Sequence, residues 1–204
     1  MATLHLMLSE GFDPEQAEAL ALALRPLVKT ETPEIICRRT AGDAAMAQFI
    51  HAVASWQLWW DALGPSAAAF VNRLGTRAAD IAWDEAEHLL AWSDVAPLAG
   101  AAAAFATAKD SLPQTSSLVI GLNIPNDRFG TVVVMEDSRP VKIAYRIARF
   151  VIRAEPISQI IQRAVAAGEA PRGPALLTFS DDGGVRIAWR SRADMREHEA
   201  RIEP

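Results

Sequence analysis

The sequence predicts an α+β fold with an N-terminal β-α-β unit, a helical middle segment and two C-terminal β-hairpins with intervening helices. Three patterns indicate this class: alternating apolar residues near the N-terminus, apolar residues at helical spacing in the middle, and β-branched runs beside turn residues in the last third. With 204 residues, 50% of them hydrophobic, the chain can bury a sizeable core. We expect one globular domain over residues 1–204, and a division into two lobes near residues 110–117 is the alternative.

The start of the chain predicts the β-α-β unit. Apolar and polar residues alternate over residues 3–8, which predicts a strand, and residues 34–39 predict a second one. Between them, Asp13 can cap a helix and Pro14 suits its first turn, so we expect a helix over residues 17–27. No glycine-rich turn follows the first strand, which argues against a dinucleotide-binding unit.

Residues 43–110 are expected to be helical. The first helix begins at Asp43 and ends at the Gly64-Pro65-Ser66 sequence, which contains two helix-breaking residues. Its predicted buried stripe consists of Met46, Phe49, Ile50, Val53, Trp56 and Trp60. The helices expected to follow cover residues 67–81, 84–92 and 95–109.

Two hairpins are expected in the last part of the chain. Residues 118–124 and 129–135 are rich in β-branched side chains and enclose a Pro-Asn-Asp turn sequence. Residues 175–179 and 185–190 enclose Asp182-Gly183, a pair that suits a type I′ turn. Both pairs of segments therefore predict antiparallel strands.

The segment between the hairpins has two interpretations. Over residues 140–154 the apolar residues alternate as in a strand, but the basic residues recur at the spacing of one helical stripe. We favour the helix, because the helical template accounts for every basic residue. A second helix is expected to begin at Pro156 and end at Gly168, and a polar helix is expected over residues 193–202.

The charge is unevenly distributed. Net charge is −5, and residues 1–100 carry thirteen acidic and six basic side chains, whereas residues 101–204 carry twelve and fourteen. An acidic chain without a nucleic-acid-binding motif is not expected to bind nucleic acid. The asymmetry is typical either of a surface that contacts a partner or of two faces of one domain.

Composition also bears on location. The single cysteine, Cys37, cannot form an internal disulfide, and residues 1–10 lack the basic and apolar regions of a signal peptide. The uncharged run at residues 44–60 carries polar residues among its apolar ones, so it predicts a buried helix rather than a membrane span. We expect a cytoplasmic protein of bacterial type with no membrane span and no cofactor.

The first candidate site is acidic. Asp80, Asp84, Glu87 and His88 would share one helical face, and the last two belong to a Glu-Ala-Glu-His sequence with Glu-x-x-His spacing. That spacing supplies metal ligands in di-metal helix bundles, where it normally occurs twice. Here it occurs once, so a solvent-exposed helix face is the alternative.

The second candidate site is basic. If residues 140–154 are helical, one ridge contains Arg139, Lys142, Arg146, Arg149 and Arg153. Guanidinium groups bind carboxylates and phosphates in two-pronged geometry, so this basic ridge could dock an acidic partner. The alternative is that these side chains form the solvent-exposed side of an amphipathic helix.

The third candidate is a tryptophan. Trp56 and Trp60 belong to the predicted buried stripe, whereas Trp59 would point away from it. Tryptophan is enriched in binding hot spots, so Trp59 is a candidate contact with a partner or a second copy. Packing inside the protein is the alternative for all three indoles.

Two functional hypotheses follow. No nucleophile-elbow, phosphate-loop or zinc-protease motif occurs, which favours a protein-binding or regulatory component that acts through surface contacts with a partner or by self-association. The alternative is a small metal-assisted hydrolase or oxidase that uses Asp84, Glu87 and His88.

Overall fold

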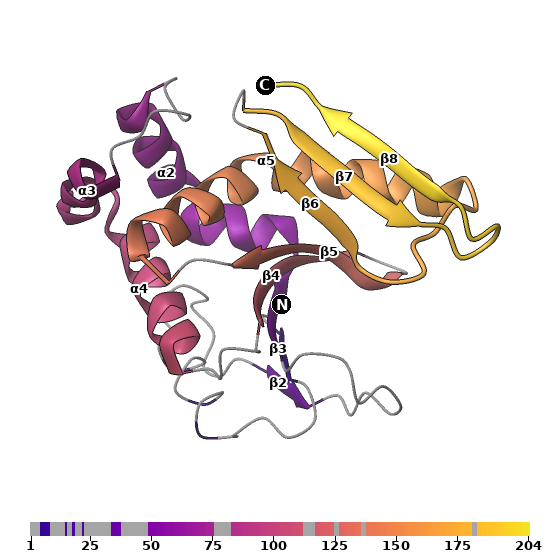
Figure 1. Ribbon diagram of the computed structural model, residues 1–204, viewed down its shortest axis with the longest axis horizontal. Helices are drawn as coiled ribbons and strands as arrows, with labels where there is room; N and C mark the ends of the chain where they lie inside the picture. Colours follow the sequence, from indigo (N-terminus) through magenta and orange to yellow (C-terminus); the bar gives the residue numbers. More distant parts are fainter. Residues whose placement is uncertain are drawn as a thin grey trace.

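One mixed β-sheet and a layer of helices make up the described part of the chain, which confirms the predicted α+β class (Figure 1). The computed structural model describes residues 5–8, 15, 18, 22, 34–37, 49–75, 83–111, 117–124, 127–135, 138–180 and 183–204. The sheet has eight strands in the order β2-β1-β3-β4-β5-β6-β7-β8. The strand order follows the chain order except at the N-terminal edge.

The first two strands are parallel neighbours, as the β-α-β prediction requires. β1 covers His5–Leu8 and β2 covers Glu34–Cys37, with His5 opposite Glu34. The helix predicted over residues 17–27 lies mostly outside the described part of the chain. Within that range Glu18 and Leu22 are described, and both are helical.

The predicted helix from Asp43 is wrong over its central part, because Phe49–Ala54 forms strand β3. β3 pairs antiparallel with β1 on one side and parallel with β4 (Ser117–Ile124) on the other. A short apolar run fits either a buried strand or a helix, and here two neighbouring strands satisfy its backbone groups. Residues 43–48 lie outside the described part.

Helix α2 (Trp56–Leu74) begins after this strand and continues through the sequence that was expected to break it. The Ser55 hydroxyl caps it by accepting a hydrogen bond from the Leu58 N–H at 3.2 Å. Pro65 lies inside the helix, and the cost of the hydrogen bond it removes is offset by complete burial of Leu63 and Phe70 on either side. Residues 67–74 are helical as predicted, but they continue α2 and do not form a separate helix, and residues 76–81 lie outside the described part.

Helices α3 (Trp83–Ala86), the 3₁₀ helix η2 (Glu87–Ala91) and α4 (Ala96–Ser111) follow, so the third and fourth predicted helices are present. The first hairpin is also confirmed, because β4 and β5 (Asp127–Met135) pair antiparallel. The alternative boundary near residues 110–117 falls between α4 and β4.

Helix α5 (Pro140–Ala166) decides the ambiguous segment in favour of a helix. It is a single helix of 27 residues, so the prediction of a separate helix that begins at Pro156 is wrong. Ala154 and Ile157 are fully buried on both sides of this proline, which shows that core contacts continue across it. α5 spans the molecule between the other helices and the C-terminal strands (Figure 1).

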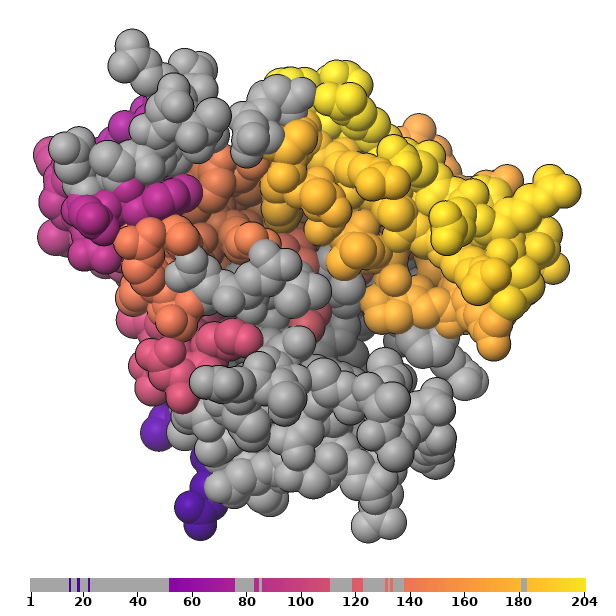
Figure 2. Space-filling model, viewed as in Figure 1, coloured from indigo at the N-terminus to yellow at the C-terminus, as the bar shows by residue number. Residues whose placement is uncertain are grey.

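The second hairpin is confirmed by β6 (Ala175–Phe179) and β7 (Val185–Arg190). The type I′ turn expected at Asp182-Gly183 is wrong, because the Gly183 N–H donates to the Ser180 carbonyl at 3.1 Å, so Gly183, at φ +96°, is the last residue of the turn. The expected C-terminal helix is wrong, because Glu197–Ile202 forms strand β8 beside β7. Its side chains alternate between exposed and half-buried, and Ala200 and Ile202 pack against the core. In Figure 2 these C-terminal residues, drawn in yellow, form one continuous area of the surface.

Candidate functional site

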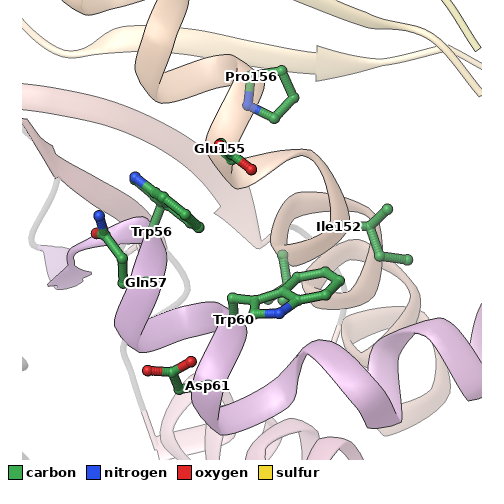
Figure 3. Close-up of a pocket in the computed structure, with 8 residues that line it drawn as sticks. Trp56, Gln57, Trp60, Asp61, Ile152, Glu155 and Pro156 are labelled. Carbon is green, nitrogen blue, oxygen red and sulfur yellow. The ribbon is translucent and has the colours of Figure 1, made fainter.

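A groove with a volume of about 500 Å³ lies between α2 and α5 (Figure 3). Its lining consists of Trp56, Gln57, Trp60 and Asp61 from α2, and of Val151, Ile152, Glu155 and Pro156 from α5. In each helix the four residues lie at positions i, i+1, i+4 and i+5, which share one helical face. The volume is in the range of ligand-binding clefts in proteins.

Trp60 supplies the exposed apolar surface of this groove. Its side chain is 42% exposed, although large apolar side chains are normally covered. A Cβ atom placed on Gly64 would lie 2.6 Å from Cδ2 of Trp60 and within 3.0 Å of two further ring atoms. The indole therefore lies with one face on its own helix, in the space that glycine leaves, and it extends toward Ile152 of α5 (Figure 3).

The charged groups of the groove are carboxylates. Asp61 and Glu155 are exposed on opposite helices, and no basic side chain is among the described residues that line the groove. The Gln159 amide donates a hydrogen bond to Oε1 of Glu155 at 3.2 Å, which restrains that carboxylate. The groove therefore favours a positively charged group.

Prolines interrupt the backbone hydrogen bonding of both helices beside the groove. In a helix the N–H of residue 156 would donate to the carbonyl of residue 152, but Pro156 has no amide hydrogen. Pro156 therefore leaves the Ile152 carbonyl without its usual helical donor, and both residues line the groove. Pro65 has the same relation to the carbonyl of Asp61. The polar lining is therefore rich in acceptors.

Replacing Gly64 with alanine should change the position of the Trp60 ring without destabilising the helix. We expect Gly64→Ala to displace the Trp60 ring, while the free energy of unfolding stays within about 1 kcal/mol because alanine favours helix. Changed chemical shifts of the Trp60 indole N–H and thermal denaturation would measure the two effects. Gly100→Ala is the control, because that glycine is also helical and has no atom within 4 Å of an added Cβ. An unmoved Trp60 signal would contradict the proposed stacking.

Trp59 is packed inside the protein, as the alternative to a partner contact predicts. It is 4% exposed, its Nε1–H donates to the Gly121 carbonyl at 2.9 Å, and its ring meets Phe150 edge to face at 5.9 Å. The assignment of Trp59 and Trp60 is therefore reversed. The signal was present in the sequence, because Trp59 continues a helical stripe with Leu63.

The structure places the predicted basic ridge along α5 and its N-cap, where much of it makes contacts within the chain. Arg149 is half-buried and donates to the carbonyls of Ser180 and Gly184 at 2.8 and 3.2 Å. Arg139 forms an ion pair with Asp84 at 3.0 Å. The ridge members Lys142 and Arg146 also have partners, and Arg153 is half-buried.

The acidic candidate residues do not converge. Asp80 lies outside the described residues, and Asp84, Glu87 and His88 are exposed. Asp84 belongs to α3, whereas Glu87 and His88 belong to the 3₁₀ helix η2, so the spacing of one α-helical face is lost. Within the described ranges, no group of three or more acidic, histidine or cysteine side chains could hold a metal ion.

A second polar cluster ties the β7–β8 turn to the end of α5. His198 Nδ1 lies 3.4 Å from Glu169 Oε2, and its ring stacks on Trp189 at 5.6 Å. The Arg196 N–H holds the pKa of the Asp194 carboxyl below its usual range. Ser191 is fully buried and accepts from Ala193 N–H, so it is not placed to act as a nucleophile despite its neighbours.

The comparisons with known proteins add no functional information. No protein-family model, curated protein or solved structure that was compared with the chain matches it. Among the described residues, no helix is long and apolar enough to cross a membrane. The chemistry of the α2–α5 groove is therefore the basis for a functional proposal.

Proposed function

We propose that this chain is a protein-binding, regulatory component whose α2–α5 groove receives a segment of a partner protein. The observation that carries the proposal is the position of Trp60, 42% exposed on the wall of a groove of about 500 Å³. Tryptophan is strongly enriched among the residues that dominate binding energy, and such residues are usually covered completely by the partner. Exposure in the unbound chain supports such a role.

The shape of the groove supports a polypeptide as the occupant. It lies between two long helices, and its lining combines the apolar surfaces of Trp56, Trp60 and Ile152 with exposed polar groups at Gln57 and Glu155. Grooves between packed helices commonly receive a peptide segment that places apolar anchors among polar contacts. This proposal moves the contact surface from the basic ridge and Trp59 to the groove, because Trp59 is buried and Arg149 binds backbone carbonyls.

Trp60 should decide partner binding if the proposal holds. The test is to place a photo-crosslinking amino acid at Gln57 and to capture the crosslinked protein from cells of the source organism. The affinity of that protein for the purified chain is then measured. Trp60→Ala should weaken that affinity at least about 30-fold, as expected when a hot-spot side chain worth about 2 kcal/mol is lost.

Trp92 provides the matched control, because it is 50% exposed but already carries Arg73 over its ring at 4.7 Å. Trp92→Ala should leave the affinity unchanged. Equal binding by wild type and Trp60→Ala would overturn the proposed function. A crosslink between two copies of this chain, together with dimers in size-exclusion chromatography, would show that the groove binds a second copy of the chain and not a different protein.

A further inference from the structure

We infer that the partner side chain that enters the α2–α5 groove is an arginine. This inference rests on the proposed function and specifies the chemistry that the groove recognises. The observation that carries it is a single groove lined by the exposed Trp60 indole and by two carboxylate residues, Asp61 and Glu155, with no basic residue in its described lining. A guanidinium group is complementary to both the indole face and the negative charge.

The aromatic part of the match is geometric. One face of the Trp60 indole lies on Gly64, so the opposite face is the one available to a ligand. A planar guanidinium group stacks on such a face and is attracted by the negative potential of the ring. The half-buried Ile152 lies on the other wall, where its apolar surface can cover the methylene stem of a long side chain.

The polar part of the match is a count of donors and acceptors. Guanidinium has five N–H donors and no acceptor. The lining residues offer the carboxylates of Asp61 and Glu155 and the amide oxygen of Gln57. A lysine ammonium carries the same charge, but it has three donors in a compact group that is strongly hydrated and cannot stack as a plane.

The overall charge supports the same choice. The chain carries a net charge of −5, so a basic partner is attracted over long range before contact. Within the described lining no lysine, arginine or histidine neutralises Asp61 or Glu155. A partner that buries these carboxylates must therefore supply positive charge, because unpaired buried charges are costly.

Three capped tripeptides test the inference on the intact chain: acetyl-Gly-Arg-Gly-amide, its lysine analogue, and its citrulline analogue, which keeps the shape of arginine without the charge. The readout is the shift of the Trp60 indole N–H resonance in NMR titrations at low salt, up to about 20 mM peptide. The arginine peptide should bind at least tenfold more tightly than the citrulline peptide and at least threefold more tightly than the lysine peptide.

Asp61→Asn/Glu155→Gln is the variant that removes both charges while it keeps the shape of the groove. It should reduce the preference for arginine over citrulline to less than twofold. The control is Asp94→Asn, which removes an exposed carboxylate that pairs with Arg73 at 2.7 Å outside the groove. Equal binding of arginine and lysine peptides, or of arginine and citrulline peptides, overturns the inference, and so does the absence of any shift.

The two proposals fail separately. If Trp60→Ala abolishes partner binding but Asp61→Asn/Glu155→Gln leaves it unchanged, the groove binds a partner and the arginine inference is wrong. If Trp60→Ala leaves partner binding unchanged, the proposed function is wrong whatever the peptides do.

Discussion

Replacing Trp59 with alanine should lower the free energy of unfolding by about 4 kcal/mol, the range measured when large aromatic side chains are removed from cores. The change removes the edge-to-face contact with Phe150 and the donor to the Gly121 carbonyl. That hydrogen bond joins α2 to strand β4, so its loss also weakens the attachment of the helix to the sheet. Urea denaturation followed by circular dichroism measures the effect.

Trp60→Ala is the matched control, because the neighbouring tryptophan lies on the same helix but is 42% exposed. Its removal should cost less than about 1 kcal/mol. Trp59→Phe should fall between the two, since it keeps most of the apolar area and loses the indole N–H. Similar losses for Trp59→Ala and Trp60→Ala would contradict the orientation of α2 described above.

Replacing Arg149 with methionine should lower the free energy of unfolding by about 3 kcal/mol, because hydrogen bonds from charged groups contribute about 1.5–3 kcal/mol. Arg149 donates to the carbonyls of Ser180 and Gly184 and to the Tyr145 hydroxyl, the last at 3.2 Å. Its guanidinium also lies 5.1 Å from the ring centre of Phe179. Methionine keeps the apolar stem and removes all of these interactions.

The loss of stability in Arg149→Met should be largest in the second hairpin. Hydrogen exchange of the amides in β6 and β7 should accelerate in Arg149→Met, while exchange in α2 changes little. Arg153→Met is the control, since that side chain is also half-buried on α5, and it should cost less than about 1 kcal/mol. If Arg149→Met and Arg153→Met had equal, small effects, Arg149 would not hold the hairpin.

The elements that could be predicted from sequence are those whose signals are local. The β6–β7 hairpin could be predicted because glycine and aspartate separate its strands, although the positive φ of Gly183 belongs to the last residue of the turn and not to a type I′ turn centre. The helix over residues 140–154 was recognised from the spacing of its basic residues, and α4 from its alanine content. In each case the preference of the segment itself agrees with its place in the fold.

The strands that sequence missed depend on their neighbours. The Phe49–Ala54 run has the composition of a buried helix or a buried strand, and hydrogen bonds to β1 and β4 decide between them. Glu197–Ile202 is polar enough for an exposed helix, yet pairing with β7 makes it a strand. Strand propensity is weak, and cross-strand pairing outweighs it.

The candidate groove also depends partly on local sequence signals and partly on contacts between distant segments. Once β3 ends at Ala54, α2 begins at Trp56, and this change turns Trp59 inward and leaves Trp60 exposed. The basic ridge was placed correctly on one helix, but its role could not be inferred because the partner of Arg149 is a distant hairpin turn.

By itself, the sequence determined the α+β class, both β-hairpins and the helical nature of α4 and α5, since turn chemistry and side-chain periodicity act between near neighbours. The tertiary structure alone decided that residues 49–54 and 197–202 are strands and that α2 and α5 continue through their prolines. It also decided that the tryptophan-bearing face of α2 meets the face of α5 that carries Glu155 in a groove. The physical reason is that backbone hydrogen bonds between strands, and the burial of one helix against another, depend on segments far apart along the chain.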